Sequence, residues 1–472
     1  MEVTAGSVAA APERQVGEDP GRSLRPNSLR FIGTVGNAIG IQAPTAGVAF
    51  LPALMAGVVG AAGPLAFLVA LVAMGFVAYA FLIFTREMAS AGSIYAFNGR
   101  ALGAAYGFVS VFLLLGVYLA YAASVFASNA NFIERLLPGG GVPWPWLAAG
   151  MWIVTVGFTY RRIAVSAAVI VALEAVSLCL VAVVAIAVLA HGGAAPGVVS
   201  AKPFTLGGLP FATLGLGVVL AFTGFSGFEV AATFGEETRA PRRIIPVSVV
   251  VALLVSGGVY VFMSWIETIG FASPDALAAS SVPLVDIAGR YISPTMGTII
   301  NVAALISGVG AQLACINGGN RLLFALGREG FGPSWLARTH PRHRSPVGAL
   351  AVVGLVSLVG TLAMYRASAI DAFFYLSTYG ADLILVVYLL TLVAALAWSV
   401  RRGNRNPLRY LFLTAGVVVI GYVIKNTAYP IPEFPFSWCI YGAGITIALA
   451  LAIVATSRRM RERLATSQMF ST

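Results

Sequence analysis

Three acidic residues lie within long apolar stretches of this sequence, where an ionised carboxylate is costly. They are Glu174, Glu229 and Asp382. Acids at membrane depth usually face the interior of a helix bundle and mark proton or substrate pathways. We therefore predict these three residues as proton-coupling groups, with a structural hydrogen-bonding role as the alternative for each.

The alternatives differ from one acid to the next. Burial of Glu174 would favour its protonated form in the working pH range. Glu229 follows an interrupted stretch, and its alternative role is to bind N–H groups freed in the other interrupted stretch. Asp382 could belong to an outer gate or to a proton path, or it could be a partner for polar groups of the first or sixth membrane span (about residues 31–52 and 209–235). A fourth acid, Glu267, lies near the end of its stretch and is expected to reach the membrane interface.

Two of the apolar stretches are interrupted by Gly and Pro. The first interruption spans residues 36–47 (GNAIGIQAPTAG) and the second spans residues 223–229 (TGFSGFE). Unpaired backbone groups are expensive in hydrocarbon, so such breaks persist only where the freed groups meet protein, water or a ligand. Matched breaks in two halves of a chain indicate a midplane binding site between transporter repeats.

The residues of the two breaks are predicted to bind the substrate. Pro44 lacks an N–H, so helical bonding must lapse there, and the start of the next half-helix suits a carboxylate. Carbonyls of the second break suit an ammonium group, with Phe225 as the preferred gating aromatic. A plain proline kink and ordinary aromatic packing are the alternatives. The predicted set is Gly40, Ile41, Gln42, Ala43, Pro44, Thr45, Ala46, Gly47, Phe222, Thr223, Gly224, Phe225, Ser226 and Gly227.

The composition is that of a polytopic membrane protein. The 472 residues are 59% hydrophobic and only 10% charged, whereas soluble domains carry about 25% charged residues. We predict an all-α fold of twelve transmembrane helices, each long enough to cross ~30 Å of hydrocarbon. The predicted spans are about 31–52, 63–84, 95–126, 145–160, 164–190, 209–235, 246–270, 295–327, 346–365, 373–399, 408–426 and 436–457.

The net charge of +11 is distributed as a topology signal. With the N-terminus inside, 24 of the 29 Lys and Arg residues lie on the inner side. This bias predicts a cell-membrane protein with both termini cytoplasmic, and it disfavours a nucleic-acid surface. The three Cys and three His residues are scattered, which predicts neither a metal site nor a cofactor.

The spans divide the chain into two similar halves. Residues 28–200 hold spans 1–5 and residues 201–402 hold spans 6–10, and an odd number of spans in each set makes the repeats inverted. Residues 403–460 hold spans 11 and 12, while 1–27 and 461–472 are cytoplasmic tails, the first of them disordered. The segment 271–294 is long enough for short helices acting as an outer lid, or it is a plain connector.

The stretch 224–246 (GFSGFEVAATFGEETRAPRRIIP) resembles the sixth-span signature of the amino acid–polyamine–organocation (APC) permeases. Weaker matches are residues 88–95, Ser166–Ala167 with Glu174, and residues 320–330. The resemblance implies a five-plus-five inverted repeat of the leucine-transporter type with helices 1 and 6 discontinuous. It also implies secondary active transport. Most members carry Gly-x-Gly where this chain has Gly40-Ile41-Gln42, so either the Gln42 amide replaces the lost donors or the substrate is an amine without a carboxylate.

The favoured function is therefore proton-coupled import of an amino acid or related amine by alternating access. The alternative is an exchanger of amino acids or polyamines on the same fold. A sodium site through Ser307 is possible but not indicated. A membrane enzyme is disfavoured because no His-Glu-x-x-His or Gly-x-Ser-x-Gly motif is present. The expected partners are the small substrate and the lipid bilayer, with no obligate protein partner and no nucleic acid.

Overall fold

The computed structural model describes residues 31–87, 94–137, 139, 141–161, 167–195, 199–234, 238–340, 345–457, 460 and 462–464. The predicted tail 1–27 and most of 461–472 lie outside them. The elements are α1 (Phe31–Gln42), α2 (Pro44–Val48), α3 (Leu51–Val59), η1 (Gly60–Ala62), α4 (Gly63–Glu87), α5 (Ile94–Leu102), α6 (Ala104–Leu136), α7 (Trp144–Tyr160), α8 (Ala167–Ala190), η2 (Lys202–Phe204), α9 (Phe211–Phe225), η3 (Phe228–Phe234), α10 (Pro241–Gly270), α11 (Pro274–Ala278), α12 (Pro283–Tyr291), α13 (Pro294–Arg328), η4 (Ser334–Ala337), α14 (Val347–Ala363), α15 (Ala369–Arg401), α16 (Pro407–Ala428) and α17 (Ser437–Thr456).

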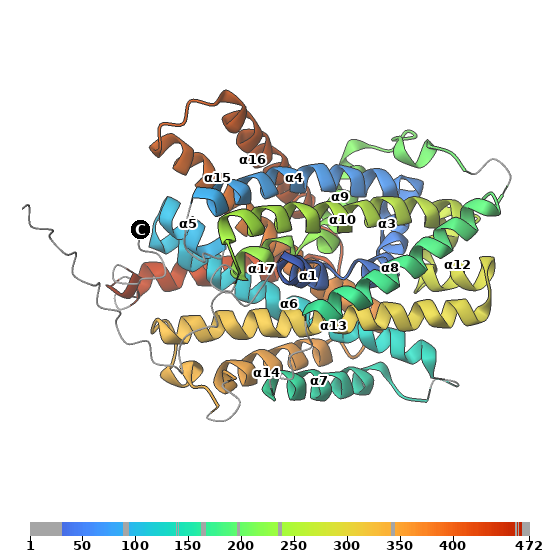
Figure 1. Ribbon diagram of the computed structural model, residues 1–472, viewed down its shortest axis with the longest axis horizontal. Helices are drawn as coiled ribbons and strands as arrows, with labels where there is room; N and C mark the ends of the chain where they lie inside the picture. The colour runs from blue at the N-terminus through green and yellow to red at the C-terminus, as the bar shows by residue number, and fades with distance from the viewer. Residues whose placement is uncertain are drawn as a thin grey trace, which may run out of the picture.

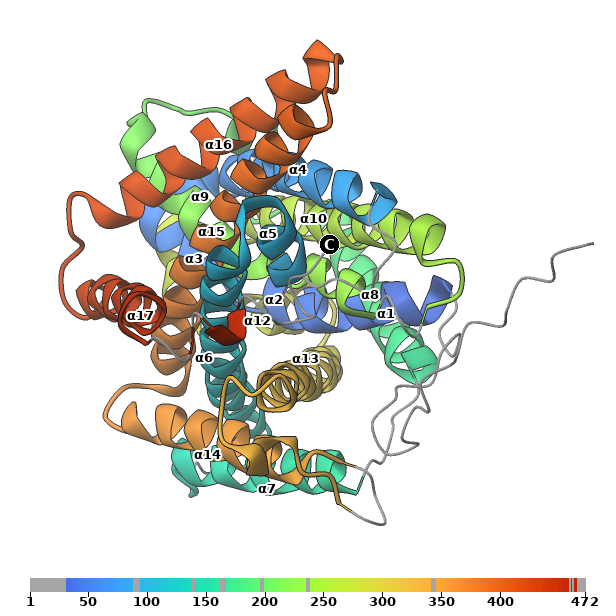
Figure 2. The same ribbon diagram turned by 90° about the vertical axis from the view of Figure 1, so that its left-hand side faces the viewer.

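The helices form a bundle whose long members run along one axis. Helices α4, α10 and α13 follow this axis in Figure 1. Viewed from one end, α7 and α14 lie together at one edge of the bundle and α16 at the opposite edge (Figure 2). Nine helical segments within the described residues are long and apolar enough to cross a membrane. The protein is thus an all-α polytopic membrane protein.

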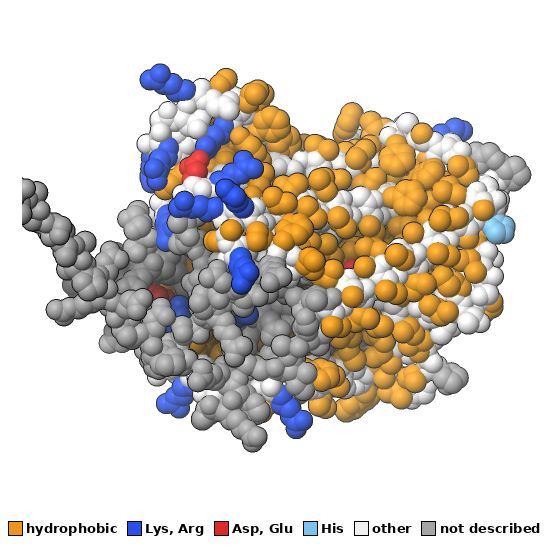
Figure 3. Space-filling model, in the orientation of Figure 1, with side chains coloured by type: hydrophobic (Ala, Val, Ile, Leu, Met, Phe, Trp, Pro, Cys, Tyr) orange, Lys and Arg blue, Asp and Glu red, His pale blue; other side chains and the backbone are white. Residues whose placement is uncertain are grey.

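The surface of the bundle is suited to lipid. Apolar side chains cover most of the right-hand part of the face shown in Figure 3, while Lys and Arg side chains on this face gather mainly at the left-hand end. Large aliphatic side chains point outward, among them Ile153 at 64% and Ile186 at 65% exposure. An apolar surface of this extent marks a membrane-facing region.

One predicted span is divided in the structure. In place of a single span 95–126, the chain forms α5 and then α6, which meet at Gly103. Gly103 has φ 110°, a conformation that glycine adopts without a steric penalty. The chain therefore changes direction there, and α6 continues ten residues beyond the predicted end of the span.

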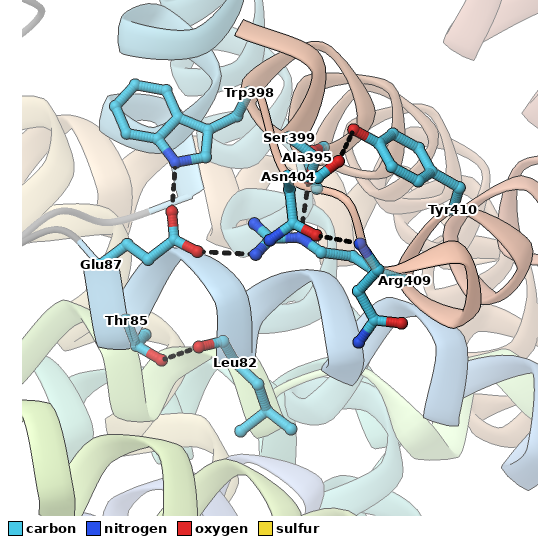
Figure 4. A network of polar contacts seen from close by, with 10 residues as sticks. Leu82, Thr85, Glu87, Ala395, Trp398, Ser399, Asn404, Arg409 and Tyr410 are labelled. Atoms are coloured by element: carbon cyan, nitrogen blue, oxygen red, sulfur yellow. Dashed lines mark hydrogen bonds and ion pairs between the residues drawn. The ribbon is translucent and has the colours of Figure 1, made fainter. Parts of the chain in front are cut away.

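A polar network joins the ends of α4, α15 and α16 at the basic end of the bundle (Figure 4). Arg409 Nη1 donates to Glu87 Oε1 at 2.8 Å, and Arg409 Nε donates to Ser399 Oγ at 2.8 Å. Trp398 Nε1 donates to Glu87 Oε2 at 2.6 Å. Arg409 is only 8% exposed, so Glu87 supplies the carboxylate that balances a largely buried charge.

Glu87→Gln is expected to lower the stability of the protein by about 1.5–3 kcal/mol, because it leaves the Arg409 guanidinium without its counter-charge. The measurement is the thermal unfolding midpoint in detergent. Arg405→Gln is the matched control, since Arg405 is an exposed cation of the same turn and its replacement should leave the midpoint unchanged. Equal shifts in both variants would show that the Glu87–Arg409 pair does not stabilise this end.

Candidate functional site: two helix breaks around one cavity

The first break lies at a single residue. Helix α1 ends at Gln42 and α2 begins at Pro44, and Ala43 between them has φ 40° and ψ 61°. A left-handed conformation is uncommon for a residue with a side chain, so neighbouring contacts must hold it. Gly40 remains inside α1, and a second interruption at Ala49 and Phe50 separates α2 from α3.

Protein groups already bind the N–H donors at the start of α2. Thr45 N donates to Glu174 Oε1 of α8 at 3.0 Å, and Ala46 N donates to Ser307 Oγ of α13 at 3.3 Å. Pro44 has no N–H to offer. In this conformation the positive end of α2 is thus capped by a carboxylate and a hydroxyl of the protein itself.

The second break is shorter than predicted. Thr223, Gly224 and Phe225 were expected to unwind, but α9 continues through Phe225 and the chain turns at Ser226 and Gly227 before η3. Gly227 has φ 117°, and a Cβ there would lie 2.4 Å from Cγ2 of Ile41. Glycine is therefore required at this turn both for its backbone conformation and for the close approach of the first break.

Glu229 binds the N–H group freed in its own break. Its Oε2 accepts from Gly227 N at 2.9 Å and from the Tyr388 hydroxyl at 2.8 Å. The alternative role stated for Glu229 named the wrong break, because Glu174 is the acid that reaches the first one. Each break thus has its own buried carboxylate, at 5% exposure in both cases.

Gln42 ties the two breaks together. Its Nε2 donates to the carbonyl of Phe225 at 3.0 Å, and its Oε1 accepts from Ser256 Oγ at 3.0 Å. The Tyr260 hydroxyl donates to the Gln42 carbonyl at 2.7 Å. The Gln42 amide, which was expected to replace the lost donors if the substrate has a carboxylate, is therefore hydrogen-bonded within the protein through both its nitrogen and its oxygen.

A cavity of about 60 Å³ lies between the breaks, which is room for a few water molecules. The side chains around it carry no charge among the described residues. Its lining consists of Ile41, Gln42, Ala43, Ala46, Gly47, Thr223, Gly224 and Ser226 from the predicted set, together with Phe50, Leu51, Tyr121, Ser124, Val125, Ser128, Tyr260, Gly308, Ala311, Cys315, Phe373 and Ser377. The other predicted residues, Gly40, Pro44, Thr45, Phe222, Phe225 and Gly227, lie outside this lining.

The aromatic residues at the cavity are not the ones predicted. Phe225 is fully buried, with its ring centroid 5.6 Å from that of Tyr260 and 6.3 Å from that of Phe67, so it is a core residue. Phe50 and Phe373 line the cavity instead, edge to face with centroids 4.5 Å apart. Phe50 follows the first break closely in sequence, whereas Phe373 belongs to α15 and carries no local signal.

The remaining two acids have no hydrogen-bond partner within the described residues. Asp382 is 8% exposed and both of its carboxyl oxygens are unpaired, so the expected polar partner from the first or sixth span is not found. The prediction that Glu267 reaches the membrane interface is wrong. Glu267 is fully buried within the bundle.

Comparisons with known proteins agree with this architecture. An uncharacterized transporter of Mycobacterium tuberculosis is 30% identical over 247 residues, which is 52% of each chain; this chain thus spans about half the length of that relative. The low-affinity putrescine importer PlaP of Escherichia coli is 25% identical over 380 residues, 77% of this chain and 80% of PlaP. The branched-chain amino acid permease BcaP of Bacillus subtilis is 27% identical over 340 residues, 64% and 68% of the two chains.

The family described as "Amino acid permease" matches residues 29–454. This range includes both helix breaks, the cavity and all four buried acids, and it covers most of the chain. The protein therefore belongs to the amino acid permease family of the APC superfamily.

Proposed function

We propose that this protein imports an amino acid or related amine across the cell membrane by alternating access, driven by protons. Family membership makes it a multi-pass membrane transporter rather than an enzyme. The observation that carries the proposal is a cavity lined by residues of both helix breaks. A solute held there would contact both half-repeats, so its binding would be sensitive to their relative position.

We further propose the twelve-span, five-plus-five arrangement. The first repeat would be α1–α3, α4, α5–α6, α7 and α8, and the second α9–η3, α10, α13, α14 and α15, followed by α16 and α17. The interrupted helices are then the first member of each set. The Lys and Arg bias supports cytoplasmic termini.

The geometry favours an amine without a carboxylate over an amino acid. The N–H donors of Thr45 and Ala46 and one N–H of the Gln42 amide are engaged within the protein. Hydroxyl groups of Ser124, Ser128 and Ser377 line the cavity. Helix α9 ends beside the cavity, and the last carbonyl groups of a helix have no N–H partner within that helix. Oxygen atoms of both kinds accept hydrogen bonds from an ammonium group. The relative PlaP, a putrescine importer, agrees with this substrate class.

Ornithine and putrescine form the sharpest pair of test substrates, since they differ by one carboxylate. In proteoliposomes with an inward proton gradient, putrescine is expected to compete with radiolabelled amine at a concentration about tenfold lower than ornithine, because a desolvated carboxylate without free donors loses affinity. Better competition by ornithine would contradict the amine assignment. Uptake that requires internal amine and ignores the pH gradient would establish the exchanger instead.

The coupling proton is proposed to bind among Glu174, Glu229 and Asp382. Glu174 and Glu229 each accept a backbone N–H, an arrangement that stabilises the ionised form. Asp382 has no donor within the described residues, and a buried carboxylate without partners is neutralised rather than left charged. Asp382 is therefore the favoured proton carrier.

A further inference from the structure

Glu267 of α10 is a buried acid with no assigned role. Its side chain is fully buried, and neither carboxyl oxygen has a hydrogen-bond partner within the described part of the chain. One turn earlier, Ser264 is 1% exposed and its hydroxyl is also unpaired there. A carboxylate left in such surroundings would carry the full cost of desolvation, whereas the neutral carboxyl avoids most of it.

The surroundings of Glu267 are set by helices that converge on one face of α10. Ser264, Glu267 and Gly270 are three residues apart and share this face. At one end, a Cβ on Gly63 would lie 3.1 Å from Ser264 Oγ. At the other end, a Cβ on Gly270 would lie 3.4 Å from Ile287 of α12 and 3.5 Å from Val188 of α8. Glu267 therefore lies in the region where α10 meets three helices: the start of α4, the end of α8, and α12.

The covering segment, residues 271–291 with α11 and α12, is attached to α10 by few polar bonds. The Tyr291 hydroxyl donates to the Gly270 carbonyl at 3.0 Å, and Arg290 Nη1 donates to the same oxygen at 3.4 Å. Its apolar side chains are buried, with Leu277 at 2% exposure and Leu284 and Ile287 fully buried. Helix α11 packs against α3 as well as α10, and α12 packs against α13 and α8 as well as α10. The Glu267 side chain has no exposure to water while the segment is in this position.

We propose that Glu267 is a proton-binding residue and that its protonated form holds the covering segment against α10. Loss of the proton to water leaves a carboxylate that must be hydrated, and hydration requires the covering segment to lift. Proton occupancy of Glu267 thus controls access to this end of the bundle. The inference goes beyond the proposed function, since it concerns the covering segment and needs no transported substrate.

Other ionisable groups on the elements around α10 are alternative sources of a pH response of the covering segment. From α12 these are Asp286, Arg290 and Tyr291; from α11, Asp275; from the end of α8, His191; and from η2, Lys202. The other ionisable groups on elements packed around α10 are Glu229 of η3, Glu174 and Cys179 of α8, and Tyr79, Arg86 and Glu87 of α4. Helices α1, α2, α3 and α9 contribute none. Asp286 is paired with Arg135 at 2.7 Å. His191 is the main competitor, because its ring lies 5.6 Å from that of Tyr291 at the end of the covering segment.

The test measures how well the underside of the covering segment is protected. Leu277→Cys places a thiol on the buried face of α11 and Ala276→Cys places one on its exposed face. Each variant of the full-length protein in nanodiscs is alkylated between pH 5 and pH 9, and modified peptides are quantified by mass spectrometry. The ratio of labelling rates at the two positions removes the intrinsic pH dependence of the thiol. This ratio is expected to rise about tenfold with pH.

Glu267→Gln imitates the neutral carboxyl and is expected to keep the ratio low and flat across the range. Glu267→Leu, which also cannot titrate, replaces it if the glutamine variant does not fold. Asp382→Asn removes the other unpaired buried acid and should retain the rise, as should His191→Gln. A flat ratio in the parent protein, or an unchanged rise in the Glu267 variants, would overturn the proposal. Loss of the rise in His191→Gln alone would assign the response to His191 instead.

Discussion

Gly227→Ala is expected to reduce amine uptake by about tenfold or more. A side chain at φ 117° adds strain of about 1–3 kcal/mol, and the new Cβ would lie 2.4 Å from Cγ2 of Ile41. Relief of this clash requires the two breaks to move apart, which also disturbs the bond from Gln42 Nε2 to the Phe225 carbonyl. The measurement is the initial rate of radiolabelled putrescine uptake into proteoliposomes.

Gly258→Ala is the matched control for this experiment. Gly258 lies inside α10, where a Cβ would meet nothing within 4 Å, so uptake should match that of the parent protein. Adding Ile41→Ala to Gly227→Ala removes the clashing methyl group and is expected to recover part of the thermal stability. Normal uptake by Gly227→Ala would show that the close approach of the two breaks is not needed for transport.

Asp382→Asn is expected to abolish the response of uptake to an inward proton gradient, a loss of about tenfold or more in accumulated substrate. Asparagine imitates the neutral carboxyl but cannot release a proton, so the gradient no longer drives a net cycle. Exchange of labelled for unlabelled amine should remain within about twofold of the parent rate, because exchange needs no net proton transfer. The two assays on the same vesicles separate coupling from binding.

Glu174→Gln and Glu229→Gln test the other two acids in the same assays. Glutamine keeps an oxygen that can accept from Thr45 N or from Gly227 N, so smaller losses of gradient-driven uptake are expected than for Asp382→Asn. Asp275→Asn changes an exposed acid of α11 and should have no effect. Full gradient-driven uptake in Asp382→Asn would exclude Asp382 as the carrier, and full uptake in all three variants would exclude the whole set.

Much of the backbone could be predicted from residue type. Long apolar stretches with Gly and Pro at their ends predict membrane helices, and the helices of the structure follow most of the predicted spans. Pro44 removes a donor and Gly227 permits a positive φ, so both breaks have a local cause. The residue at which each break begins could not be predicted from nearby residues. Helix α9 stays helical through Phe225, whose carbonyl accepts a hydrogen bond from Gln42.

The contacts of individual side chains depended on helices far away in the sequence. Tyr121, Tyr260 and Phe373 reach the cavity from α6, α10 and α15, and no pattern near either break points to them. Glu174 and Glu229 were recognised as buried acids, but which break each one caps was decided by the packing of α8 against α2 and by the turn at Gly227.

The sequence by itself determined that the chain crosses the membrane as helices, where two of them are interrupted, and which acids are unusual. Backbone hydrogen bonding and transfer into hydrocarbon depend on residues close together along the chain, so these features are local. Only the tertiary structure decided that Phe225 is a core residue, that Phe50 and Phe373 face the cavity, and that Glu267 is fully buried. Burial and contact are properties of packed neighbours, and those neighbours come from distant parts of the chain.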